Sequence, residues 1–100
     1  MRVYISGPIT GRKMDEYMRH FADAEHKLKC RGHSVVNPAL VNSNLPKDFN
    51  HDDYMVVSLT ELITCDAICI LKGWHRSKGS REEIEEALRR RMPILYEEDL

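Results

Sequence analysis

The sequence predicts one α/β domain, a three-layer arrangement in which helices cover both faces of a four-stranded parallel sheet of order 2-1-3-4. Three observations lead to this prediction. Short apolar runs suited to buried strands alternate with longer segments of helical periodicity. The order strand, helix, strand repeats along the chain, which implies right-handed parallel crossovers. The 100 residues suffice for one core and are too few for two, so we expect a single domain over residues 1–100.

The first part of the chain supplies two strands and a helix. Residues 2–6 contain a β-branched and aromatic run typical of a strand, and the glycines and proline that follow it prevent further pairing. Apolar residues then recur at three- and four-residue steps from Lys13 to Arg31, which predicts an amphipathic helix. Gly32 is expected to end that helix in the C′ position. Residues 34–37, before a proline, form the second strand.

The remainder continues the same alternation after one irregular segment. Residues 38–51 are rich in Asn, Pro and Asp and show no periodicity, so we expect an exposed loop there, most mobile over 37–45. The elements expected beyond it are a helix over residues 53–64, a buried strand over 67–71, a helix that begins between Ser77 and Ser80 and ends near 91, and a strand over 93–96.

This topology predicts where a ligand would bind. In open parallel sheets, ligands occupy the carboxyl edge near the point where strand order reverses, here between the first and third strands. The loops after the first three strands, residues 6–12, 37–45 and 72–80, all leave the sheet at that edge. We therefore expect them to wall one pocket.

Composition excludes several classes of function. The 15 basic and 16 acidic residues nearly balance, so a nucleic-acid polymer is not an expected partner. No apolar run approaches the roughly 20 residues of a membrane span, and no leader precedes the first strand, so we expect a cytoplasmic protein. Cys30, Cys65 and Cys69 lack metal-ligand spacing and are interpreted as reduced, mostly buried thiols. No metal or cofactor is predicted.

Glu83 is the glutamate best placed for chemistry. It borders the apolar face of the last predicted helix beside Ala87, whereas Glu82 and Glu86 point away from that face. In the first turn of the helix, at the sheet edge, its carboxylate would be kept ionised by the positive helix end and would suit a nucleophile. The alternative is a capping box, in which Glu83 returns a hydrogen bond to Ser80.

Other polar and aromatic residues have both structural and functional interpretations. Tyr4 on the first strand fits core packing, but its hydroxyl needs a partner and the pocket edge is near. The segment Gly7–Gly11 is either an ordinary turn or a cradle for a phosphate or a sugar hydroxyl, and it is neither a dinucleotide-binding motif nor a P-loop. Trp74, in a polar loop, could stack on a planar base. Surface or capping positions are the simplest interpretation of His33, His51, His75, Asp52, Asp53 and Asp66.

In order along the chain, several short motifs resemble the nucleoside 2-deoxyribosyltransferase-like superfamily, and most closely its small DUF4406-type domains. These motifs are Tyr4-Ile-Ser-Gly-Pro-Ile-Thr-Gly11, Val35-Val-Asn-Pro38, Cys65-Asp-Ala-Ile68, Gly73-Trp74, Ser77-x-Gly-x-x-x-Glu83-x-x-x-Ala87 and Ile94-Leu-Tyr96. The resemblance implies a flavodoxin-like fold and cleavage or transfer at the N-glycosidic bond of a 2′-deoxynucleoside or its 5′-monophosphate. It also implies a homodimer or higher homo-oligomer.

The resemblance assigns roles to matching positions. Glu83 takes the place of the nucleophile, Tyr4 that of the tyrosine that orients it, and Ser77 that of a serine that holds the phosphate in the monophosphate hydrolases. Relatives carry a second catalytic aspartate eight residues before Asp66, where this chain has Ser58, so Asp53 is the acidic residue left to supply that role. The predicted substrate-binding residues are Ser6, Gly7, Pro8, Ile9, Gly11, Asn37, Gly73, Trp74, Ser77 and Gly79.

A second hypothesis comes from the same residues. Without an aspartate at Ser58, the domain could bind or sequester a nucleotide without cleaving it, whereas Tyr4, Ser77 and Glu83 favour the enzyme. A redox domain of the same fold is disfavoured because the chain has no Cys-x-x-Cys motif.

Overall fold

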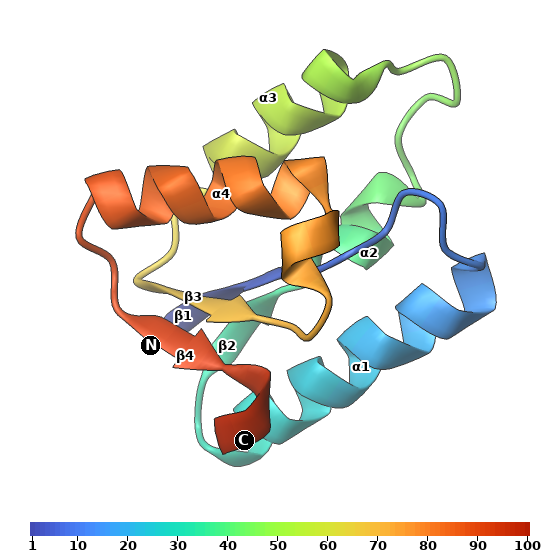
Figure 1. Cartoon of the computed structure of the whole chain (residues 1–100). Coiled ribbons are helices and arrows are strands. Elements are labelled where there is room, and N and C mark those ends of the chain that lie inside the picture. Colours follow the sequence, from blue (N-terminus) through green and yellow to red (C-terminus); the bar gives the residue numbers. More distant parts are fainter.

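Four parallel strands form a single sheet in the order β2-β1-β3-β4 in the computed structural model, which describes residues 1–100 (Figure 1). The two central strands are β1 (Arg2–Ser6) and β3 (Ala67–Ile70), and the edges are β2 (Ser34–Val36) and β4 (Ile94–Tyr96). The parallel sheet and its predicted order are confirmed. The strand order reverses between β1 and β3. The sequence predicted a ligand site at the carboxyl edge of the sheet near this point.

Side chains of β1 alternate between the two faces of the sheet. Val3 and Ile5 belong to a core cluster with Phe21 and Leu28 of α1 (Met14–Cys30). Tyr4 belongs to a second cluster on the opposite face, built with side chains of α3 (His51–Leu62) and α4 (Lys78–Arg89). Figure 1 shows α1 on one side of the sheet and α3 and α4 on the other, so the three-layer arrangement is confirmed.

The segment after β2 differs from the prediction of an exposed loop over residues 38–51. Pro38–Asn42 form a short helix, α2, and Pro38 and Ala39 are buried. The Asn37 side chain accepts a hydrogen bond from the Ala39 amide at 3.0 Å. An asparagine cap followed by proline in the first turn is a strong local helix start, and it explains why a segment without periodicity is helical.

Two helix ends bear on predictions made from the sequence. Gly32 adopts φ +87 just after α1, as the predicted C′ position requires. The cap of α4 is Ser77, whose Oγ accepts from the Ser80 amide at 3.2 Å, so the alternative capping box between Ser80 and Glu83 is wrong. Because α4 begins at Lys78, Glu83 lies in its second turn and not in the first.

The remaining elements are two single 3-10 turns, η1 (Trp74–Arg76) and η2 (Glu97–Asp99). No helix has the length and apolar character needed to span a bilayer.

All three cysteines are free; Cys69 is buried and Cys65 is half-buried, whereas Cys30 is exposed, contrary to expectation. Desolvation raises the pKa of the Cys69 thiol to about 11, so that thiol is unreactive at neutral pH.

Candidate active site

A cavity of about 420 Å³ lies at the carboxyl edge of the sheet. The loops after the first three strands all contribute to it, as the topology predicted. They supply Gly7, Ile9 and Thr10, then Pro38, Asn42 and Ser43, then Ser77, Gly79 and Ser80. The other lining residues are Tyr17 of α1, Glu83 of α4, and His51, Tyr54, Met55 and Ser58 of α3.

Glu83 is the only carboxylate in this lining and its side chain is 6% exposed. The Tyr4 phenol donates to Oε2 of Glu83, and the Ser6 hydroxyl donates to Oε1 at 2.8 Å. Tyr4 and Ser6 share a face because they are two residues apart on one strand, and α4 packs over that face. Two buried donors therefore hold one carboxylate in a single orientation at the wall of the cavity.

The charge state of Glu83 is set mainly by burial. Desolvation raises the pKa of its carboxyl to about 7, and the hydrogen bonds from Tyr4 and Ser6 oppose part of that rise. The expectation that the helix end keeps Glu83 fully ionised is therefore wrong, because the residue lies beyond the first turn and burial dominates. Burial and the neighbouring Glu83 charge hold the pKa of Tyr4 well above its usual range, so its phenol stays a donor.

The start of α4 presents further polar groups to the cavity. The Ser77 hydroxyl accepts from the Ser80 amide and keeps its own hydrogen free to donate. The Oγ of Ser80 is buried and has no hydrogen-bond partner. Gly79 lines the cavity between them, and first-turn amides of a helix have no backbone acceptor. Hydroxyls and amides at this end can together receive a polar or anionic group.

Helix α3 contributes residues that the sequence interpretation missed. His51, interpreted as a surface residue, lines the cavity, and its Nε2 lies 3.2 Å from Oε2 of Glu82. Tyr54 and Met55 also line it, as does Ser58, which lies near the Tyr4 phenol and opposes a small part of the rise in its pKa. The available signal was the helical spacing of His51, Met55 and Ser58, which places them on one face of α3.

The structure does not bring Asp53 to the cavity. Its carboxylate accepts from the Asn50 amide at 3.0 Å, and the Asn50 side chain accepts from the Asp53 amide in return. This capping box holds the Asp53 side chain at the start of α3, outside the lining. A second carboxylate, predicted for that position, is therefore absent from the cavity. Asp66 is also structural: it accepts from the Arg2 amide at 2.8 Å.

Five of the predicted substrate-binding residues lie outside the main cavity. Asn37 caps α2 and donates to Glu25 at 2.9 Å. Gly73 takes φ +88 before η1, and the ring of Trp74 is 37% exposed and packs edge-on against His75. The other two residues outside the lining are Pro8 and Gly11. Gly7, Ile9, Ser77 and Gly79 line the cavity as predicted, and Ser6 reaches it through Glu83.

No group of three or more His, Cys, Asp or Glu side chains is arranged to hold a metal ion. The lining of the cavity contains one buried carboxylate, one histidine, several hydroxyls and two tyrosine rings. This set of groups suits a small polar organic ligand that carries a planar ring.

Comparison with known proteins agrees with this geometry. A family model described as "Domain of unknown function (DUF4406)" matches residues 1–96. Among solved structures, the fold is similar to a 2-deoxyribosyltransferase from the psychrotolerant bacterium Bacillus psychrosaccharolyticus, with a TM-score of 0.74 and 16% sequence identity over 96% of this chain and 71% of that chain. No curated protein sequence matches. The predicted resemblance and the fold are confirmed, and at this identity the structural likeness speaks for the fold alone.

Proposed function

The chain belongs to the DUF4406 family, and from this premise we propose that it binds a 2′-deoxynucleoside or its 5′-monophosphate and breaks the N-glycosidic bond through Glu83. One observation carries the proposal: the Glu83 carboxylate is buried at the cavity wall and oriented by Tyr4 and Ser6. A carboxylate held this way beside a cavity is suited to attack an electrophilic carbon.

The proposed step is a displacement at the anomeric carbon. An oxygen of Glu83 forms a bond to C1′ while the bond from C1′ to the base nitrogen breaks, and the electron pair leaves with the base. The base takes a proton from a water molecule, and water or a second base later displaces the carboxylate from C1′ and gives up a proton to solvent. Each Glu83 oxygen accepts one protein hydrogen bond and keeps further lone-pair capacity for this attack.

The charge state of Glu83 supports this role. With a pKa of about 7, the carboxyl is partly ionised near neutral pH and only the ionised form attacks. Positive charge develops on the sugar as the base leaves, and a buried carboxylate stabilises that charge more strongly than an exposed one. The energetic cost of burying the carboxylate in the free protein is thus offset as the transition state forms.

The lining supports a nucleoside as the ligand class. The hydroxyls of Thr10, Ser43 and Ser77 and the amide of Asn42 provide partners for sugar hydroxyls and base edges. The rings of Tyr17 and Tyr54 offer faces on which a planar base can stack. A cavity of about 420 Å³ lies within the range of small-molecule sites.

A second function is favoured by one observation. Glu83 is the only carboxylate in the lining, since Asp53 caps α3 and Ser58 stands where relatives are expected to carry an aspartate. Two carboxyl groups normally share glycosidic cleavage, one as acid and one as nucleophile. A protein that holds the nucleotide without cleaving it would need only the binding groups.

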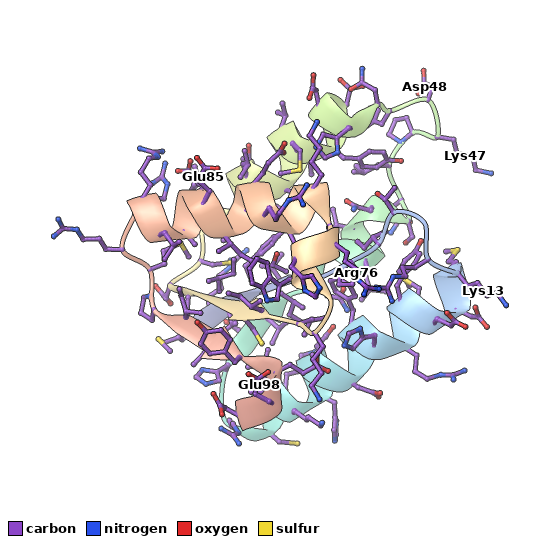
Figure 2. The ribbon with its side chains drawn as sticks, viewed as in Figure 1. Lys13, Lys47, Asp48, Arg76, Glu85 and Glu98 are labelled. Carbon is purple, nitrogen blue, oxygen red and sulfur yellow. The ribbon has the colours of Figure 1, made fainter.

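A base-release assay separates these functions. The purified protein is incubated with the four common 2′-deoxynucleosides and with their 5′-monophosphates, and the free base is measured by liquid chromatography. We expect wild type and Glu85→Gln to release base and Glu83→Gln to lose at least roughly 10³-fold in rate. Glu85 is a matched control because it is exposed on the same helix, and Figure 2 shows it directed away from the sheet.

The same experiment can contradict the proposal. Release by Glu83→Gln at the wild-type rate would exclude Glu83 as nucleophile. A rise in unfolding temperature with ligand, together with no base release by wild type, would identify a binding module.

A further inference from the structure

We propose that His51 is a specificity-determining residue that selects the 5′-monophosphate over the free deoxynucleoside by pairing with its phosphate. This inference rests on the proposed function, because it concerns a substrate of the same cavity. It is carried by the charges of the lining, by the position of the imidazole and by an unpartnered buried hydroxyl of the same lining.

The charges of the lining single out His51. No lysine or arginine lines the cavity, and Glu83 brings a carboxylate into it. A phosphomonoester carries about −1.5 to −2 charges at neutral pH, so a lining without a cation would disfavour it. His51 is the only lining residue whose side chain can become positive. Its imidazole is therefore the group that decides whether an anionic substrate is accepted.

The imidazole lies at the end of the cavity where an anion would bind. A Cβ built on Gly79 would lie 3.9 Å from Cε1 of His51 and 4.0 Å from Oγ of Ser77. The ring, the glycine and the hydroxyl thus converge on the first turn of α4, where α3 and α4 pack together. Sδ of Met55, at 3.5 Å from that Cβ, also borders this position, and Gly79 itself adds no side chain to it.

A separate observation shows that this end of the cavity lacks a partner. Ser80 is 1% exposed, lines the cavity, and its Oγ has no hydrogen-bond partner in the protein. Buried hydroxyls are normally satisfied, so an unpaired one at a cavity wall points to a ligand atom. The Ser77 hydroxyl and the first-turn amides of α4 that do not donate to the Ser77 cap add further donors. Together they form a set of neutral donors to which His51 adds the charge.

Glu82 sets the orientation of the imidazole. Its Oε2 lies 3.2 Å from Nε2 of His51, so Nε2 carries the hydrogen that this contact needs. Nδ1 is then the ring nitrogen left for a ligand, and it donates to phosphate once the ring is protonated. The same carboxylate can pair with the imidazolium form of the ring.

Calorimetric titration tests this assignment with three ligands: a 2′-deoxynucleoside, its 5′-monophosphate and inorganic phosphate. Wild type is compared with His51→Asn, which removes the charge, with His51→Lys, which keeps one, and with His26→Asn. His26 is an exposed histidine on α1 outside the lining, and it serves as the control. All proteins are titrated in the same buffer at the same pH.

We expect His51→Asn to weaken monophosphate binding by about 10- to 100-fold and nucleoside binding by less than about twofold. His51→Lys should bind the monophosphate at least as well as it binds the nucleoside, and His26→Asn should match wild type. The assignment would be overturned if His51→Asn lost affinity equally for the monophosphate and the nucleoside. It would also be overturned if His51→Lys bound the monophosphate no better than His51→Asn does.

Failure of the proposed function is distinguishable from failure of this inference. If monophosphate selection depends on His51 but no base is released, the phosphate assignment stands and the glycosidic chemistry does not. If wild type binds neither the nucleoside nor the monophosphate, both are overturned.

Discussion

The Tyr4 phenol donates a hydrogen bond to the Glu83 carboxylate and so joins β1 to α4 across 79 positions of sequence. Tyr4 is fully buried on a central strand, so the donor cannot move without disturbing the sheet. Glu83 is carried by a helix that packs over the same face. The orientation of the proposed nucleophile is therefore set by the packing of helix against sheet, and not by a flexible loop.

Replacing Tyr4 by Phe should test this contact. The variant keeps the ring in the core and removes one of the two donors to Glu83, so the pKa of Glu83 should rise further. We expect base release to fall roughly 10- to 100-fold and the pH profile to move to higher pH. Tyr96→Phe, on the exposed end of β4, is the control. An unshifted profile in Tyr4→Phe would show that the phenol does not tune Glu83.

Base release should increase with pH around neutrality. The pKa of Glu83 is about 7 because burial disfavours its charged form, and attack on C1′ requires that form. The rate constant kcat/KM should therefore be low below about pH 6 and reach a plateau above about pH 8. Measurement across this range with one substrate suffices. A rate that falls as pH rises through neutrality would mean that the protonated carboxyl acts instead.

Glu83→Gln should stabilise the protein at alkaline pH even as it abolishes activity. The pKa of Glu83 is raised from 4.5 to about 7, so the stability contributed by its neutral form is present below pH 4.5 and lost as pH rises through 7. Glutamine stays neutral, and the stability difference in favour of the variant should grow between about pH 4 and pH 8 by on the order of 3 kcal/mol. Urea unfolding at several pH values measures it. A difference that does not change with pH would contradict the shifted pKa.

Ser58→Asp should increase base release. Ser58 is 5% exposed in the cavity wall beside Tyr4, so an aspartate there would face the same space as Glu83. Two neighbouring carboxyls raise the pKa of one of them, which then holds the proton that a leaving base needs. We expect a gain of roughly 10- to 100-fold over wild type. Ser58→Asn has the same shape without an acidic proton, and an equal gain in that variant would exclude acid catalysis.

Gly7→Ala should destabilise the fold through a steric clash. A Cβ at Gly7 would lie 2.8 Å from Cδ1 of Leu71 and 3.0 Å from its Cβ, inside a fully buried part of the core. We expect a loss of about 1–3 kcal/mol in the free energy of unfolding. At Gly79 the nearest atom to an added Cβ is Sδ of Met55 at 3.5 Å, so Gly79→Ala should leave stability nearly unchanged. Thermal unfolding of the two variants compares them directly.

The fold was largely predictable because its signals are local. The period of the apolar residues separates α1 from β1, and the compact alternation of strand and helix implies parallel order. The helix over Pro38–Asn42 was missed because too few residues were available for periodicity, although Asn37 and Pro38 marked its start. The cap at Ser77 was ambiguous from the sequence because both Ser77 and Ser80 are suitable cap residues.

The site was less predictable because its properties are not local. Asp53 and Trp74 have residue types suited to chemistry, but a capping box holds one and an exposed turn holds the other, both outside the cavity. His51 has no motif around it and enters the site only because α3 packs against α4. Residue type alone does not indicate which side chains converge.

From the sequence alone one learns the order and type of the elements, the edge of the sheet that carries the cavity, and the identity of Glu83 as the residue to examine. Only the packed structure determines that Tyr4 and Ser6 hold this carboxylate, that its pKa is about 7, and that His51 joins it in one cavity. The reason is physical: helix and strand propensities depend on neighbouring residues, whereas desolvation and hydrogen-bond partners depend on atoms brought together from distant positions.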